Sequence, residues 1–257
     1  MHAILELTRG ILIKYDLIVA LALVGAIMWI SYWISNQLTR GRLHGSAIAI
    51  LVGLVLAFIG GRATGGENGL ADVAVFAGVG VLGGTMLRDF AIISTAFGVD
   101  VREIRRAGPV GVISLFLGVV VSFIVGACVG YGFGYRDAVS LTTIGGGAAT
   151  YIVGPVTGSA LGATKSVQTL SFAVGLVKAI LVMIATPLIA KSIGLNNPRT
   201  AMIFGGLMGT TSGVTGGLAA TDARLVPYGA MTATFYTGLG CLMGPSIIFI
   251  VMRMIFG

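Results

Sequence analysis

The chain has 257 residues, of which 56% are hydrophobic and only 10% are charged, and its mean hydropathy is +1.01. Soluble domains carry about a quarter charged residues, so this composition excludes a soluble globular protein and indicates an integral membrane protein in a lipid bilayer. The net charge of +7 does not indicate nucleic-acid binding, because the basic residues stand between apolar segments, where membrane topology places them.

Apolar segments of near-spanning length recur along the chain and predict helices rather than the short alternating strands of a membrane barrel. Residues 1–15 mix apolar and charged side chains, which predicts a short interfacial helix. The spans expected after it lie at about 17–36, 46–60, 71–98, 109–133, 137–163, 167–193, 200–221 and 227–252. The segment 71–98 is either one broken span or one span plus a re-entrant piece.

The expected fold is therefore an all-α integral membrane protein with roughly eight transmembrane segments. We expect a single polytopic domain over 1–257, with N-terminal spans at 17–133 and a C-terminal half at 137–252. The loops 37–45 and 99–108 hold most of the loop arginines, so the positive-inside bias predicts that these two loops are cytoplasmic.

Two similar stretches stand out in the C-terminal half: LTTIGGGAAT at 141–150 and GTTSGVTGGLAAT at 209–221. Each has a Thr-Thr pair, crowded glycines and then Ala-Ala-Thr, inside an apolar segment. Glycine at this density opposes a continuous helix, and paired Gly-interrupted spans indicate a transporter's binding site. The stretches therefore predict at least two discontinuous helices. The alternative interpretation is that Gly, Ser and Thr only allow close helix packing.

The orientation of the two stretches is open at this point. Only one uninterrupted span separates them, so they run parallel if both cross the membrane completely. An inverted repeat requires that one of them re-enters, or that one pairs with a third glycine-rich stretch at 78–84. Within 137–163, Gly154 and Pro155 are expected to interrupt the helix a second time.

Broken helices offer two kinds of ligand. The free N–H groups at a half-helix N-terminus favour an anion, and hydroxyl groups can bind a carboxylate. The substrate-binding candidates from the two stretches are Thr142, Thr143, Thr150, Thr210, Thr211 and Ser212. Free carbonyl groups suit a hard cation such as sodium, and the expected sodium ligands are Gly146, Gly147, Gly213 and Thr215.

Two basic residues complete the candidate site. Lys178 stands within the apolar segment 167–193, where a cation is costly and by default marks a functional site. Its alternative role is an internal pair with a carboxylate or with carbonyl groups at a helix end. Arg88, which closes a glycine-rich span, is a second candidate for contact with an anion. With two histidines in no cluster and no cofactor fingerprint, we expect neither an enzyme nor an organic cofactor.

Several blocks of the sequence carry a resemblance to a known family: 38–46 (LTRGRLHGS), 86–92 (MLRDFAI), 137–163, 175–179 (GLVKA) and 194–241. Through these blocks, and over about 17–250 as a whole, the sequence resembles the MadM family, the larger membrane subunit of the bacterial malonate carrier. The resemblance implies sodium-coupled uptake of malonate across the bacterial inner membrane by a multi-pass protein. It also implies a small membrane subunit of the MadL type as partner, in a hetero-oligomer that can contain further copies.

Two other classes compete with a malonate carrier. A fainter similarity, over about 139–245, is to LrgB/CidB-type proteins, which implies a permease for a small monocarboxylate such as pyruvate, or a holin-like export protein. The other class is the sodium-pump subunit of a biotin-dependent decarboxylase, for which this chain is short and shows no motif that handles carboxybiotin. Competition by pyruvate and acetate in an uptake assay separates a malonate carrier from a monocarboxylate permease.

Overall fold

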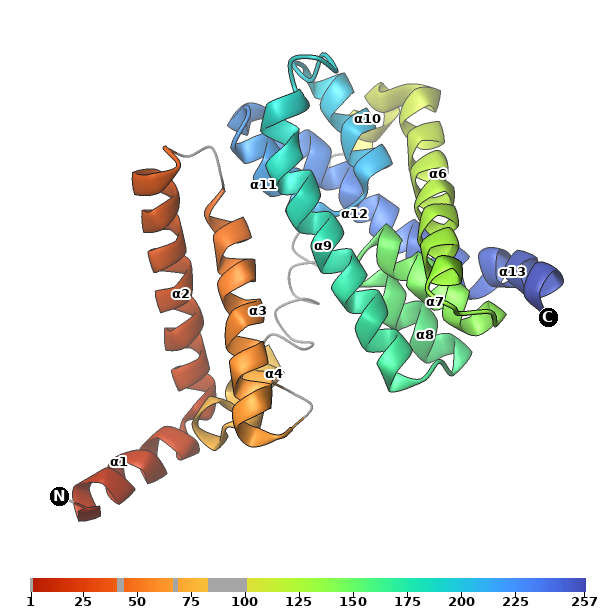
Figure 1. Ribbon diagram of the computed structural model, residues 1–257. Coiled ribbons are helices and arrows are strands. Elements are labelled where there is room, and N and C mark those ends of the chain that lie inside the picture. Colours follow the sequence, from red (N-terminus) through yellow and green to blue (C-terminus); the bar gives the residue numbers. More distant parts are fainter. Residues whose placement is uncertain (1, 41–43, 67–68, 83–100) are drawn as a thin grey trace. The chain divides into compact units, whose positions relative to one another are not determined.

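All regular secondary structure in the described part of the chain is helical, so the all-α prediction is confirmed (Figure 1). The structure is a computed structural model, and it describes residues 2–40, 44–66, 69–82 and 101–257. The chain divides into two compact units, Met1–Ser94 and Thr95–Gly257. The single membrane domain expected over 1–257 stays a prediction.

The N-terminal unit contains two long apolar helices that lie side by side. They are α2 (Asp16–Leu38) and α3 (Gly45–Thr64), preceded by α1 (His2–Lys14) and followed by η1 (Gly69–Asp72), η2 (Ala74–Phe76) and α4 (Gly78–Val81). His44 caps α3, because its Nδ1 accepts a hydrogen bond from the N–H of Ser46 at 3.4 Å. Burial lowers the pKa of His44, which favours the neutral ring that this cap requires.

The described N-terminal helices agree with the predicted ones at 1–15, 17–36 and 46–60. The interfacial position of α1 stays a prediction. Of the segment expected at 71–98, the structure describes only the beginning, which forms short helical turns, and the remainder lies outside the described residues.

The C-terminal unit begins with the long helix α6 and continues through shorter helices. Its elements are α6 (Val101–Gly132), α7 (Ala138–Ala149), α8 (Val153–Leu161), α9 (Lys165–Ile189), α10 (Pro198–Met208), α11 (Thr211–Ala219), η4 (Ala223–Leu225), α12 (Val226–Met243), the π-helical turn η5 (Gly244–Ile248) and α13 (Phe249–Phe256). α6 bends at Gly108, whose φ of 64° is left-handed, immediately before Pro109.

In the described part of the chain, five segments have the length and apolar composition to cross a membrane. They are Asp16–Leu38, Gly45–Phe76, Gly108–Gly132, Lys165–Ile189 and Ala223–Phe256. The predicted count of roughly eight is therefore not confirmed for the described residues. The difference in the C-terminal unit comes from the segments that contain the two glycine-rich stretches, because the segments expected as spans at 137–163 and 200–221 each fold into two short helices.

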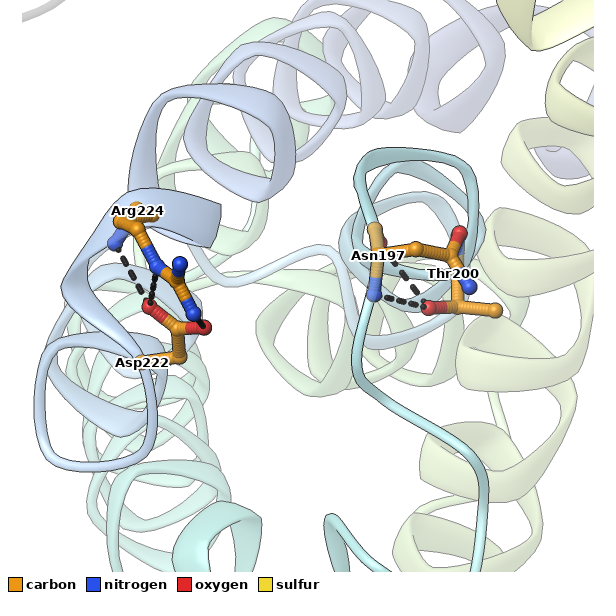
Figure 2. Close-up of polar contacts among 4 residues, drawn as sticks. All are labelled: Asn197, Thr200, Asp222 and Arg224. Atoms are coloured by element: carbon orange, nitrogen blue, oxygen red, sulfur yellow. Dashed lines mark hydrogen bonds and ion pairs between the residues drawn. The ribbon is translucent and has the colours of Figure 1, made fainter.

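Local capping explains where several of these short helices begin. Asp137 caps α7 by accepting a hydrogen bond from the N–H of Ser140 at 2.7 Å. Burial raises the pKa of Asp137, but the hydrogen bonds from Ser140 and its neighbours outweigh burial and hold this pKa below its ordinary value. Asn197 and Thr200 form a capping box at the start of α10 (Figure 2). The same figure shows the Asp222–Arg224 ion pair, at 2.8 Å, that begins η4.

The helices α7 and α8 form an antiparallel hairpin, which we call hairpin 1 (138–161). A Cβ atom on Gly158 would lie 2.7 Å from Cγ2 of Thr143, and one on Gly154 would lie 2.8 Å from Cα of Gly147. Residue numbers therefore rise along α7 as they fall along α8. The tip of hairpin 1 is the turn at 150–152, where the backbone of Thr150 is extended, with φ −152° and ψ 159°.

Pro155 does not interrupt a helix, which corrects the prediction of a second break. It occupies the third position of α8, where a proline is tolerated because the first N–H groups of a helix have no partner inside the helix.

The helices α10 and α11 form a second, more open hairpin, which we call hairpin 2 (198–219). Gly205 of α10 faces Thr232 of α12, and Gly209 faces Tyr236, so α10 and α12 run in the same direction. Leu218, at the end of α11, contacts Gly229 near the start of α12, so α11 runs in the opposite direction. The tip of hairpin 2 is 209–210, and Gly209 has the left-handed φ of 72° that ends α10.

The two hairpins approach the middle of α9 from opposite ends (Figure 1). Hairpin 1 contacts α9 at Gln168, Ser171 and Gly175, and hairpin 2 contacts it at Ala179, Met183 and Thr186. In both cases the contact nearest the centre of α9 belongs to the tip region. The two hairpins are thus inverted relative to each other, and both turn back, although the helices that carry the glycine-rich stretches, α7 and α11, both run in the direction of α9. α7 is only 12 residues long, about 18 Å, and the bilayer core is about 30 Å thick.

Glycine allows this packing where backbones meet. A Cβ atom on Gly147 would clash with the carbonyl group of Ser171, and one on Gly175 would clash with the backbone of Tyr151. These close approaches place the tip of hairpin 1 against α9.

Candidate functional site

Lys178 lies near the middle of α9, between the contacts of the two hairpin tips. Its Nζ donates to the carbonyl oxygen of Ala149 at 2.9 Å and to Oγ of Ser122 at 3.1 Å. The hydroxyl oxygen of Tyr236 is 3.5 Å away, and the centroid of its ring is 5.3 Å away. Among the residues that the structure describes, no carboxylate pairs with Lys178. Among the described residues, neutral oxygens and an aromatic ring hold the ammonium group.

Tyr236 of α12 joins this lysine to both hairpins and to α6. Its side chain is fully buried, and its hydroxyl group lies 2.7 Å from Oγ of Ser122 and 3.1 Å from the carbonyl oxygen of Gly118. Its ring lies where a Cβ atom on Gly209 would be, so only glycine fits at this position of the hairpin 2 tip. The chain thus brings α6, α9, α12 and both tips together around Lys178 and Tyr236.

The tip of hairpin 1 presents the carboxyl end of α7. Ala149 is the last residue of that helix, and its carbonyl oxygen is the closest oxygen that Lys178 contacts. Thr150 turns the chain, since its Oγ1 accepts hydrogen bonds from the N–H groups of Ile152 at 3.2 Å and Val153 at 3.1 Å. The carboxyl end of a helix carries partial negative charge, which stabilises the ammonium group in the absence of an anion.

The tip of hairpin 2 presents the amino end of α11. No side chain caps this helix, and Oγ1 of Thr210 and Oγ of Ser212 are buried without a hydrogen-bond partner in the described part of the chain. Thr210 has no exposed surface. Buried hydroxyl groups and free N–H groups at a helix N-terminus are costly when unpaired, and together they can bind an anion.

The predicted substrate-binding residues divide into three groups. Thr150, Lys178, Thr210, Thr211 and Ser212 lie at or between the tips. Thr142 and Thr143 lie further back in α7, where their Oγ1 atoms donate to the carbonyl groups of Ala138 at 2.6 Å and Val139 at 2.7 Å. Arg88 lies outside the described residues.

The predicted sodium ligands lie on both hairpins. Gly146 and Gly147 are in the last turn of α7, and Gly213 and Thr215 are in the first half of α11. Gly213 approaches the carbonyl oxygen of Ala179 so closely that a Cβ atom there would be 2.8 Å from it. In the described part of the chain, no group of three His, Cys, Asp or Glu residues could hold a metal ion. The sodium assignment stays a prediction.

Sequence reasoning missed Ser122 and Tyr236. Ser122 stands alone within the apolar α6, where a single serine gives no signal, and Tyr236 reads as a packing residue of an apolar segment. Both become part of the site only because α6 and α12 converge on Lys178, which no sequence spacing reveals.

Comparison with known proteins identifies the family. Residues 8–256 match the MadM family, described as the malonate/sodium symporter MadM subunit. No curated protein and no solved structure matches the chain. The family is one of transporter subunits, so the expectation that the chain is not an enzyme is confirmed. Apolar helices of spanning length, two opposed hairpins and a match over nearly the whole sequence lead to one conclusion: the chain belongs to the MadM family of malonate/sodium symporter subunits.

Proposed function

We propose that this chain is the substrate-binding subunit of a secondary transporter that imports malonate together with sodium. The family description supports both the substrate and the coupling ion. One structural observation carries the proposal. A lysine within an apolar helix, Lys178, is paired only with neutral oxygens in the described part of the chain. A buried ammonium group without a counter-ion favours the binding of an anion.

Malonate suits the arrangement because it is a compact dicarboxylate with two negative charges. One carboxylate pairs with Lys178. The other accepts hydrogen bonds from the amino end of α11, where the hydroxyl groups of Thr210 and Ser212 lack partners. A monocarboxylate would leave one of these two groups unsatisfied, which is costly for buried polar groups. The site therefore favours malonate over pyruvate and acetate.

Sodium entry supplies the driving force in this proposal, and carbonyl groups of the hairpins supply its ligands. We further propose that the chain lies in the bacterial inner membrane and works with a small membrane subunit of the MadL type, in a complex that can contain several copies. The description of the family as a subunit supports a second component.

Uptake of labelled malonate into proteoliposomes tests the proposal, with this chain alone and with its small partner. We expect Lys178→Ala to reduce uptake about 100-fold or more, since removing one partner of a buried charge pair costs about 3 kcal/mol or more. Lys191→Ala is the matched control, because Lys191 is exposed and follows α9. Malonate uptake by this variant should equal that of the native chain.

The ion and the substrate have separate readouts. Replacing external sodium by choline, with the proton gradient collapsed, should abolish uptake, and excess pyruvate or acetate should not compete. Native uptake kinetics in Lys178→Ala would exclude a substrate role for the lysine. Uptake that is indifferent to sodium would exclude sodium coupling, and strong competition by pyruvate would favour a monocarboxylate permease.

A further inference from the structure

An apolar groove lies on the C-terminal unit, between α6, α7 and the segment η5–α13. Its volume is about 210 Å³. Apolar cavities of about 150 Å³ already bind a benzene molecule. The lining side chains are apolar except for Thr142, whose hydroxyl group donates to the carbonyl oxygen of Ala138. The groove therefore offers a carboxylate or an ion no polar partner, and it is distinct from the site at Lys178.

The groove reaches from the surface of this unit into its core. Phe123 of α6 and Leu141 of α7 line it and are only 2% and 0% exposed, so they form its base. Ile124, Ile247 and Val251 also line it and are about half exposed, so they form its rim. One turn of a helix with its side chains, about 10 Å wide and 5.4 Å tall, exceeds the volume of the groove. A flexible hydrocarbon chain can enter it.

The bilayer supplies such a chain. The groove lies between two segments that have the length and apolar composition of membrane spans, Gly108–Gly132 and Ala223–Phe256. Its exposed rim therefore opens to the hydrocarbon of the membrane. Water does not fill an apolar hollow of this kind, and an empty hollow forfeits the dispersion contacts of its walls.

Aromatic rings and two arginines lie beyond one end of the groove. Ala127 is the last groove residue of α6, and Tyr131 follows it one turn later. The ring of Tyr131 contacts that of Phe256 at the end of α13, with the centroids 5.7 Å apart. The guanidinium group of Arg136 lies over the same tyrosine ring, 3.8 Å from its centroid. Arg253 directly follows the groove residues of α13.

The two arginines give this end of the groove a positive charge. Neither pairs with a carboxylate in the described part of the chain. Arg136 donates to the carbonyl oxygens of Tyr131 and Tyr135, and the neighbouring Asp137 is engaged as the cap of α7. Aromatic rings and basic side chains are typical of the level at which lipid headgroups meet hydrocarbon, and arginine binds phosphate groups well.

We propose that the groove binds one acyl chain of an anionic phospholipid, whose phosphate group lies at Arg253 and Arg136. The tail covers the base at Phe123 and Leu141. Because Leu141 belongs to α7, the bound tail also packs on hairpin 1. The inference stands apart from the proposed function, since it concerns a lipid and not the transported anion.

Native mass spectrometry of the full-length chain in detergent, titrated with phosphatidylglycerol or phosphatidylcholine, tests the headgroup. We expect the first phosphatidylglycerol molecule to bind about fivefold more tightly than phosphatidylcholine, because one arginine near the membrane surface changes the affinity for anionic lipid by about that factor. Arg253→Gln should remove most of this preference. Lys191→Gln is the matched control, because Lys191 is exposed and does not line the groove, and it should leave the preference unchanged.

Filling the groove tests the tail. Ala127→Phe and Val120→Phe each place a ring in it, and Val120 is on the partly exposed side, so this variant keeps the test available if Ala127→Phe does not fold. In both variants the first lipid should bind no more tightly than the next one. Val125→Phe is the control, since Val125 is exposed on α6 and does not line the groove, and its lipid binding should equal that of the native chain.

Three results would overturn the proposal. The first is equal affinity of the native chain for the two lipids. The second is native lipid binding in both ring variants, which would mean that phosphatidylglycerol meets surface charge only. The third is release of the bound lipid when the small membrane subunit is added, which would mean that protein side chains cover the groove in the complex.

Discussion

At the scale of single residues, Tyr236 has two separable roles. Its ring packs on Gly209 at the tip of hairpin 2, and its hydroxyl group holds Ser122 beside Lys178. Tyr236→Phe keeps the ring and removes the hydroxyl group. We expect malonate uptake to fall about tenfold while the fold is retained, because one hydrogen bond near a charged group is lost. Transport assays and thermal unfolding of the same preparation measure the two effects.

Tyr228→Phe is the control for this prediction, since Tyr228 lies two turns earlier on α12 and does not contact Lys178. Equal uptake in Tyr236→Phe and the native chain would show that the hydroxyl group does not position the lysine.

The sequence predicted Lys178 because a cation in an apolar helix is conspicuous in any sequence. It gave no comparable signal for Thr157 of α8, whose buried hydroxyl group has no hydrogen-bond partner in the described part of the chain, whereas Thr142 and Thr143 donate to carbonyl groups of their own helix. Its Oγ1 packs against Gly146 of α7 and against Gly244, where the π-helical turn begins, and sequence spacing does not reveal these contacts. Residue type alone therefore could not distinguish a self-bonded threonine from an unpaired one.

At the scale of elements, the contact of hairpin 1 with α9 depends on glycine. We expect Gly147→Ala to destabilise the protein by about 1–3 kcal/mol, because the added methyl group would clash with the carbonyl group of Ser171. Gly238→Ala is the control, since a Cβ atom on that glycine meets nothing within 4 Å. Thermal unfolding in detergent compares the two variants. If Gly147→Ala unfolds at the same temperature as Gly238→Ala, the close approach of α7 and α9 does not exist.

The breaks in the helices followed from glycine density, but the hairpins did not. A high density of glycine indicates that the backbone can leave a helix. It does not indicate the direction in which the chain continues. That direction is set at the tips, by the cap of Thr150 on α8 and by the left-handed conformation of Gly209. The expected break at Pro155 was wrong for a related reason, since the turn at 150–152 makes it part of the first turn of a new helix.

At the scale of the whole molecule, the opposed hairpins predict a definite labelling pattern. Single cysteines are introduced into a chain whose Cys128 and Cys241 have been replaced by serine. Arg136→Cys and Lys165→Cys flank hairpin 1 and should react with an impermeant reagent from one side of the membrane. Arg199→Cys and Arg224→Cys flank hairpin 2 and should react from the other side, because each hairpin returns to the side from which it enters.

The positive-inside bias identifies the two sides. The bias predicts that loop 99–108, at the start of α6, is cytoplasmic. Because α6 runs antiparallel to α7, hairpin 1 opens on the side where α6 ends. Hairpin 2 is opposed to hairpin 1 and therefore opens on the side where α6 begins. Arg199→Cys and Arg224→Cys should therefore be labelled from the cytoplasm. Reaction of Arg136→Cys and Lys165→Cys from opposite sides would show that the first glycine-rich stretch crosses the membrane and is not a hairpin.

The meeting of the two tips near the middle of α9 has an electrical consequence. A charge that moves across the whole membrane gains or loses about 2.3 kcal/mol per 100 mV, and each hairpin occupies about half of that path. An ion that reaches the tips from either side therefore crosses only about half of the membrane potential, about 1.2 kcal/mol per charge per 100 mV. Voltage then acts on substrate entry and on substrate release to similar extents, so neither step alone bears the full cost of moving an anion into a negative interior.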